Sequence, residues 1–217
     1  MSLLRALPAL LLLTACDAQS GGTSNASPEV IADSVAEVIA DLTTIGAAPA
    51  TMPLSGRATY SGYATAFVKE TITDQIGRQL VGTATLDATF TAAGGTIDGT
   101  IRDMLGKTGV NQTELFSAIQ NGRASDIEDI LADYTQATGQ IALADSPISG
   151  AGFTVPIDGT ITHEGDTLRF DGRGTGNFSG DGATGVQVTG IAGGAGDMTL
   201  TENNALRAGT LAVVAAQ

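Results

Sequence analysis

The sequence predicts an all-β protein, an eight-stranded up-and-down antiparallel β-barrel with an N-terminal helix and a short helical insertion. Glycine is frequent, with 29 in 217 residues, and it is interleaved with β-branched residues without the collagen period. That mixture is typical of strands and tight turns. Long segments also alternate between apolar and polar residues with a period of two, as strands do. The length suits one such domain with short appendages.

The chain is acidic, with a formal net charge of −13 at pH 7. Removal of residues 1–15 takes away one arginine and leaves 9 basic against 23 acidic residues, or −14. Electrostatics therefore argue against nucleic acid and against anionic lipid headgroups as partners. The simplest interpretation is that the acidity keeps a secreted protein soluble. Attraction to a cationic partner or to metal ions is the alternative.

Residues 1–15 are predicted to be a lipoprotein signal peptide. Arg5 supplies the positive charge, and the apolar stretch Leu7–Leu13 is too short to be a transmembrane helix. The stretch ends in Leu13-Thr14-Ala15-Cys16, which resembles the bacterial lipobox. By that resemblance Cys16 is alkylated by diacylglycerol and becomes the first mature residue. Two or three acyl chains would then hold the protein to a lipid bilayer, since one chain is marginal.

The segment after the predicted cleavage site bears on two questions, how the domain is tethered and to which membrane it is attached. Residues 16–27 are small and polar, which predicts a flexible tether. Cys16 is the only cysteine, which excludes an intramolecular disulfide and a cysteine-based metal site. We expect an anchor in the bacterial cell envelope, in the outer membrane on its surface or periplasmic face. Asp17 resembles the inner-membrane retention signal of enteric bacteria and leaves the inner membrane open.

An amphipathic helix is predicted over 28–42, inside a helix-and-linker unit of residues 28–48. Ser27 can cap it, and Pro28 and Glu29 suit a first turn. Apolar residues follow at helical spacing: Val30, Ile31, Val35, Val38, Ile39 and Leu42. We expect this helix to pack on the domain or to close one barrel end, with a partner-binding helix as the alternative.

The barrel domain is predicted to cover 54–217, because the period changes from helical to two at Leu54. The predicted strands are 54–68, 80–91, 96–103, 140–143, 153–163, 168–178, 186–190, 198–200 and 206–214. These eight or nine strands run up and down, and closure into a barrel hides their edges. A β-sandwich shows the same alternation, so it remains an alternative to the barrel. An outer-membrane barrel is disfavoured because aromatic residues are few and the chain ends in Gln217.

A helical insertion is expected at about 107–135. Apolar spacing within 112–134 fits two short helices divided at Asn121-Gly122. Four acidic residues of this segment are interpreted as a solvated helix face: Asp126, Glu128, Asp129 and Asp133.

The stretch from Gly174 to Gly190 resembles a signature of transferrin-binding protein B and related surface lipoproteins. In that family a strand ends in Gly-x-Phe-x-Gly, a Pro-x-Ala turn follows, and the next strand reads x-Glu-x-x-Gly. Four residues match as a structural turn motif: Phe178, Gly180, Ala183 and Gly190. Residues 82–90 with 95–101 likewise look like a barrel hairpin of that family, and together the two segments cover about half of 54–217.

The resemblance implies a single eight-stranded barrel on a lipid tether. The chain departs from the family pattern, since no proline stands at 181–183 and Gln187 replaces the usual acidic residue. The family's large host-binding lobes would not fit in this length. Transferrin binding is not carried over, because no partner-contacting motif can be matched residue by residue.

No motif in the sequence calls for catalysis, and we expect no catalytic, cofactor-binding or metal-binding residue. Gly180-x-Gly182-x-x-Gly185 matches a dinucleotide-binding pattern only formally, because it lies between predicted strands and is better explained as a turn. The sole histidine, His163, is predicted to be a surface residue at a strand end, with haem ligation a distant alternative. Glu164 should point to the opposite side of the sheet from His163.

The function favoured by these features is a membrane-anchored lipoprotein binding module. It would capture a protein partner or a small ligand, such as an iron compound, without catalysis. The alternative is a structural or accessory envelope lipoprotein with no ligand, which a barrel filled with side chains would favour. A hydrolase would need a convergent pair of acids, or His163 beside a nucleophile.

Overall fold

A computed structural model of the chain describes residues 27–45 and 51–217. The predicted signal peptide, Cys16, the predicted tether up to residue 26 and residues 46–50 lie outside the described residues. The helices are α1 (Pro28–Ile45), α2 (Gln112–Asn121) and α3 (Ala124–Leu131). The strands are β1 (Gly56–Lys69), β2 (Ile76–Thr91), β3 (Gly94–Asn111), β4 (Thr135–Gln136), β5 (Thr138–Ser149), β6 (Gly152–His163), β7 (Asp166–Ser179), β8 (Gly185–Ala192), β9 (Met198–Glu202) and β10 (Ala205–Ala216).

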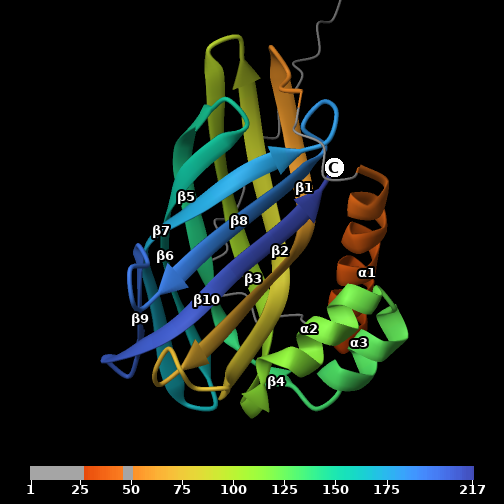
Figure 1. Cartoon of the computed structure of the whole chain (residues 1–217). Helices are drawn as coiled ribbons and strands as arrows, with labels where there is room; N and C mark the ends of the chain where they lie inside the picture. The colour runs from red at the N-terminus through yellow and green to blue at the C-terminus, as the bar shows by residue number, and fades with distance from the viewer. Residues whose placement is uncertain (1–26, 46–50) are drawn as a thin grey trace, which may run out of the picture.

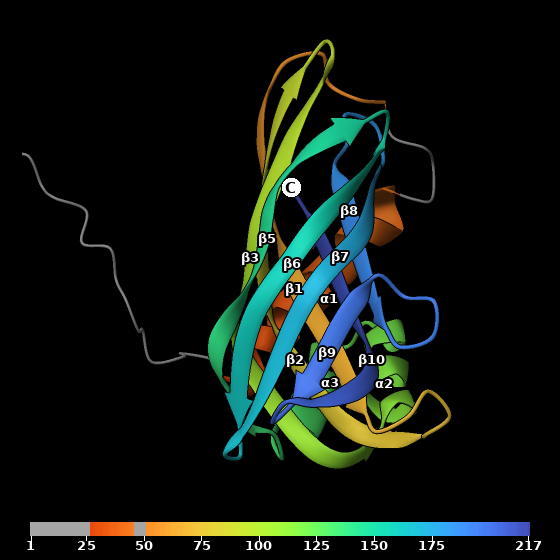
Figure 2. The same ribbon diagram turned by 90° about the vertical axis from the view of Figure 1, so that its left-hand side faces the viewer.

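The strands close into one barrel (Figure 1, Figure 2). Their order is β2-β1-β10-β8-β9-β7-β6-β5-β3-β4, and the additional pairing of β2 with β3 completes the ring. The predicted all-β barrel class is therefore confirmed. The strand count differs slightly from the predicted eight, because nine strands of five or more residues form the wall together with the two-residue β4.

The extra strands arise because two positions in the wall are interrupted. β10 pairs with β8 along 209–216 and with β9 along 205–207, and β7 pairs with both as well. β8 and β9 are thus two halves of one position, separated by the glycine-rich segment 193–197. β4 and β5 share a position beside β3 in the same way. The strands therefore occupy eight positions around the barrel.

A bulge in β3 explains why this strand is longer than predicted. Asp103 has a positive φ of 53°, and the pairing of β2 with β3 shifts register between Val81 and Thr83. One extra residue exchanges the two faces of a strand, so the period-two pattern breaks there. Ile101 points into the barrel before the bulge, and Leu105 packs against the helices after it. β3 continues to Asn111, beyond the predicted strand end at Asp103.

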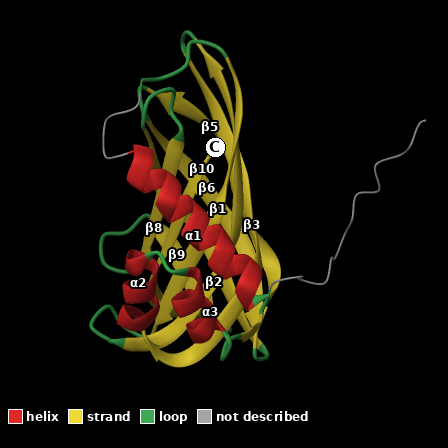
Figure 3. Cartoon of the chain, turned by 90° about the vertical axis from the view of Figure 1, so that its right-hand side faces the viewer, coloured by secondary structure: helices red, strands yellow, loops and turns green. Residues whose placement is uncertain are grey.

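The three helices lie on the outer wall of the barrel (Figure 3). The buried side chains of α1 pack with outward-facing Tyr63, Val81 and Leu105 and with the apolar faces of α2 and α3. Of the two placements expected for α1, the structure shows packing on the domain. Asn111 is the N-cap of α2, and its side chain accepts a hydrogen bond from Thr113 N. Gly122, in the left-handed conformation, is the C-cap.

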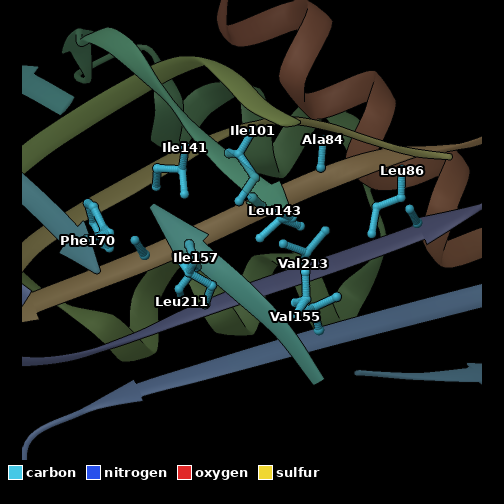
Figure 4. Close-up of a cluster of buried hydrophobic side chains, with 14 of the residues drawn as sticks. Ala84, Leu86, Ile101, Ile141, Leu143, Val155, Ile157, Phe170, Leu211 and Val213 are labelled. Carbon is cyan, nitrogen blue, oxygen red and sulfur yellow. The ribbon is translucent and has the colours of Figure 1, made fainter. Parts of the chain in front are cut away.

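The second and larger core fills the barrel. Inward-facing residues alternate with exposed ones, as in β6, where buried and exposed positions follow each other along most of the strand. Side chains of β2, β3, β5, β6, β7 and β10 converge in the interior (Figure 4). They are mostly aliphatic, with the few aromatic rings concentrated toward one end of the barrel.

Candidate functional site

The barrel interior is packed with side chains. Figure 4 shows Ile101 of β3, Ile141 of β5, Ile157 of β6, and Leu211 and Val213 of β10 reaching toward one another, and each is at most 1% exposed. In barrels that hold a small ligand, the ligand occupies this space. The functional surface therefore has to be sought at the barrel ends and on the outer wall.

Phe178, the aromatic residue of the resembling motif, is the centre of one barrel end. Its ring centroid lies 5.8 Å from that of Tyr60, 5.7 Å from Phe90 and 5.3 Å from Phe153, with tilted or edge-on planes. These arrangements are favourable for aromatic pairs. Phe178 is 3% exposed, so its role is to seal this end.

The turn after Phe178 is held by hydrogen bonds to its backbone. Ala183 is buried with a φ of 58°, and its carbonyl accepts hydrogen bonds from Tyr60 Oη at 2.6 Å and from Gln217 Nε2 at 3.1 Å. Burial raises the pKa of Tyr60 to about 12, so its hydroxyl remains a donor. Gly180 has a φ of 78°, and a Cβ there would lie 2.4 Å from Ile45 Cγ2 of α1.

Gly190, the last motif residue, faces the barrel interior from β8. A Cβ at this position would lie 2.9 Å from Ile157 Cδ1 and 3.0 Å from Met198 Sδ. The four motif residues thus lie within the β7–β8 unit, three at the aromatic end and Gly190 further along the wall. None of them presents a reactive group to solvent.

The opposite barrel end is sealed by a polar network. Arg78 points into the barrel, is 5% exposed, and forms ion pairs with Asp166 and, at 3.2 Å, with Glu202. Glu202 also accepts a hydrogen bond from Arg207 Nε, and Asn203 donates to Asp166. The Arg78 and Asn203 hydrogen bonds lower the pKa of Asp166. Composition and alternation gave no signal for this network, because its members come from three separated segments, at residues 78, 166 and 202–207.

His163 belongs to this sealed end, and the prediction that it is a surface residue is wrong. The residue is 1% exposed, and its Nε2 hydrogen-bonds Thr135 Oγ1 at 2.8 Å. Burial lowers the pKa of His163. The expectation for Glu164 is also wrong, because β6 ends at His163 and Glu164 turns with a φ of 54°. Glu164 Oε2 consequently lies 3.8 Å from His163 Nδ1.

A hydroxyl, an imidazole and a carboxylate in this order are the groups of a nucleophilic triad. The geometry does not support that chemistry. The 3.8 Å separation is too long for a hydrogen bond, and the His163 side chain is 0% exposed, so no substrate can reach it. Gly106 lies so close that a Cβ there would be 2.8 Å from His163 Nε2. We interpret the group as part of the barrel seal.

The acidic residues of the helical insertion remain solvated. Glu128, Asp129 and Asp133 are exposed, Asp126 is partly exposed, and Asp133 pairs with Lys107 at 3.1 Å. Within residues 27–45 and 51–217, no group of three or more His, Cys, Asp or Glu is placed to hold a metal ion.

A hollow of about 640 Å³ lies on the outer wall at strands β5, β6 and β7. It forms where the β5–β6 ladder is interrupted between Leu143 and Ile148. Its lining comes from three strands: Asp145, Ser146, Pro147 and Ser149 of β5, Gly152, Phe153, Thr154 and Pro156 of β6, and Arg173, Thr175 and Gly176 of β7. This feature is not predictable from the sequence, because the interruption leaves only a gap in the alternation between two predicted strands.

Arg173 is one of three described cations, with Arg57 and Arg123, whose exposed side chains have no hydrogen-bond or ion-pair partner among the described residues. It is exposed in the hollow, and none of the described residues forms an ion pair or side-chain hydrogen bond with its guanidinium. Its backbone N–H donates to Asp197 O at 3.0 Å, which fixes the strand but leaves the side chain free. An unpaired guanidinium offers a planar set of donors to a carboxylate or a carbonyl.

Two smaller hollows, of about 270 and 180 Å³, adjoin α2 on the other side of the molecule and share Phe67, Lys69 and Gln112 in their walls. Exposed Ile72, Phe116 and Ile191 line one or the other. Among the described helices, none is long and apolar enough to cross a membrane.

Comparison with known proteins identifies no family. No protein-family model matches the chain, and no curated protein sequence matches it. Among solved structures, a double mutant of the vaccine antigen Transferrin Binding Protein B from Haemophilus parasuis Hp5 is similar at a TM-score of 0.41 and 18% identity, over 76% of this chain and 26% of that one. A single mutant of the same antigen gives a TM-score of 0.39 and 14% identity, over 76% and 27%. The chain thus spans about a quarter of the length of these two neighbours.

Proposed function

We propose that the protein is a lipid-anchored envelope lipoprotein whose barrel is a non-catalytic binding module for a protein partner. The anchor is the acylated Cys16, and the outer membrane is the proposed site of attachment. The partner is taken up on the outer wall, at the hollow of β5, β6 and β7. The observation that carries the proposal is the combination of a filled barrel with this exposed hollow.

The filled interior favours a protein partner over a small ligand held inside the barrel. Phe170, Leu168 and Ile161 are fully buried, and side chains of this kind fill the space that a ligand inside the barrel would need. Direct iron coordination by the protein would also require a cluster of metal-binding side chains. Within the described residues, no three His, Cys, Asp or Glu side chains are placed to hold a metal ion.

The hollow has the features of a protein contact. Pro147 and Pro156 offer rigid apolar surface, the threonine hydroxyls offer adaptable hydrogen bonds, and Arg173 offers a charged anchor. Arginine is enriched at the energetically dominant positions of interfaces. Because Arg173 is unpaired in the free protein, no internal ion pair has to be broken when it binds.

Site-specific photo-cross-linking in cells tests this function. A photo-cross-linking amino acid replaces Thr154, which lies in the hollow, or Thr160, which is exposed on the same strand outside it. We expect a discrete adduct from position 154 and none from 160, and Arg173→Ala should reduce that adduct. Equal adducts from both positions, or none from position 154, would remove the hollow as the binding surface.

A structural or accessory role without a ligand is the second candidate, and the filled barrel interior favours it. In that role the protein would be a spacer or subunit in a membrane complex. Its signature is a constant stoichiometry with one envelope complex, with Arg173→Ala leaving that association unchanged.

A further inference from the structure

Strongly exposed large apolar side chains are concentrated at one end of the molecule. The described residues include seven of them, and Leu54, 75% exposed, is at the aromatic end. The other six lie toward the polar end: Val30, Ile72, Ile76, Phe116, Ile191 and Leu206. Isolated exposed apolar residues need no explanation, but a one-sided concentration indicates a contact surface.

The strand register places most of these residues close together. Thr210 of β10 pairs with Phe67 on one side and with Ile191 on the other. Ile72 lies in the β1–β2 turn, where a Cβ on Gly193 would be 3.1 Å from Ile72 Cγ2. Ile76 pairs with Asn111, the cap of the helix that carries Phe116. We call Ile72, Ile76, Phe116 and Ile191 the apolar rim.

The first turn of α1 lies at the same end as the apolar rim. The far end of this helix approaches the β7–β8 turn, where Cβ atoms built on Gly180 and Gly185 would lie 2.4 Å from Ile45 and 3.0 Å from Leu42. Pro28 is therefore directed away from the aromatic end, and Figure 3 shows α1 crossing the wall diagonally toward α3. Eleven residues separate Cys16 from Pro28. They can span at most about 40 Å, so an anchored Cys16 holds the first turn of α1 within that distance of the bilayer.

We propose that the apolar rim is a second membrane contact, which docks the polar end of the barrel onto the bilayer and points the β5–β7 hollow away from its surface. This inference rests on the proposed lipid anchor. The acidic chain is repelled by anionic lipids, so the contact requires neutral headgroups such as ethanolamine lipids. Apolar burial then adds to the acyl anchor and fixes the orientation of the domain.

The accessibility of single introduced cysteines tests the docking, because Cys16 is the only cysteine and its thiol is alkylated in the lipidated protein. The variants are Ile72→Cys in the rim and Leu54→Cys as the matched control, which is 62% against 75% exposed in the wild type. Each lipidated protein is added to preformed phosphatidylethanolamine–phosphatidylcholine vesicles and reacted with a bulky, water-soluble maleimide. The same two variants in a Cys16→Ser background, in buffer without vesicles, give the reference rates.

On vesicles we expect the thiol at position 72 to react several-fold more slowly than its reference, and the thiol at 54 to react at its reference rate. If the protein floats with the vesicles and both thiols keep their reference rates, the anchor stands and the rim contact is refuted. Protection of position 72 in cells but not on vesicles would also overturn it, by assigning the rim to a protein partner. A protein that fails to float refutes the anchor, and the docking with it.

Discussion

At the scale of single residues, Phe178 is expected to make a large contribution to the stability of the fold. It contacts three aromatic rings and is buried, so Phe178→Ala should lower the free energy of unfolding by about 3–5 kcal/mol. Phe116→Ala is the matched control, because Phe116 is 54% exposed and its loss should change stability by about 0.5 kcal/mol or less. Urea unfolding followed by circular dichroism measures both. Similar losses in the two variants would contradict the assigned seal.

The buried imidazole predicts a pH dependence of stability. Because burial lowers the pKa of His163, the unfolded chain binds this proton more readily than the folded protein does. The free energy of unfolding should therefore fall as pH falls from about 6.5, the ordinary pKa of histidine, to the lowered folded value, and this contribution is constant outside that window. His163→Gln removes the titrating group and should flatten this part of the curve.

Unfolding of the wild type and the His163→Gln variant from pH 8 to pH 5 measures this difference. The lowered pKa of Asp166 acts in a separate range, below its ordinary value of 3.8, where stability is lost as pH falls. A wild-type curve parallel to that of the variant between pH 5 and pH 6.5 would show that His163 does not titrate as a buried group.

His163 also shows what a single sequence cannot reveal about residues. Its strand-end position was correctly predicted, but its burial depends on Gly106 and Thr135, which come from other segments of the chain. Long-range contacts of this kind have no local periodicity. The Phe178 motif was visible in the sequence, since the spacing of its glycines is local.

At the scale of elements, the packing of the β7–β8 turn against α1 can be probed by comparing two glycines. Gly180 and Gly182 have similar φ values of 78° and 71°, but only at position 180 does a Cβ meet other atoms, Ile45 Cγ2 of α1 at 2.4 Å and Thr184 Oγ1 of the turn at 2.5 Å. Both alanine variants should lower the free energy of unfolding by about 1–2 kcal/mol, because alanine is strained in the left-handed conformation. Gly180→Ala should lose measurably more, because its methyl group has to displace Ile45 at the end of α1 and the Thr184 side chain. Equal losses in thermal unfolding would show that α1 does not depend on this turn.

Element types were largely predictable, and their interruptions were not. The alternation located the long strands, and the Asn121-Gly122 boundary between two helices agrees with the left-handed cap at Gly122. The bulge at Asp103 hid the last part of β3, because an extra residue exchanges the inner and outer faces. The hollow was not predicted because regular pairing of β5 with β6 stops between Leu143 and Ile148, so the period-two pattern is lost there as well.

At the scale of the whole molecule, the two ends of the barrel have different chemistry. One end is sealed by aromatic rings and the other by the Arg78 network, and the exposed apolar rim accompanies the polar end. Closure was predicted from the need to hide strand edges, since the alternation alone is shared with a β-sandwich. The asymmetry was not, because it depends on which turns meet at each end.

The proposed function depends most on the lipid anchor at Cys16, and metabolic labelling with a radioactive fatty acid tests this anchor most directly. Wild type and Cys16→Ser are expressed in a Gram-negative host, and their label and flotation with membranes are compared. We predict that the wild type carries the label and floats, and that Cys16→Ser carries no label and stays in the soluble fraction. An unlabelled wild type, or equal labelling of both proteins, would contradict the account.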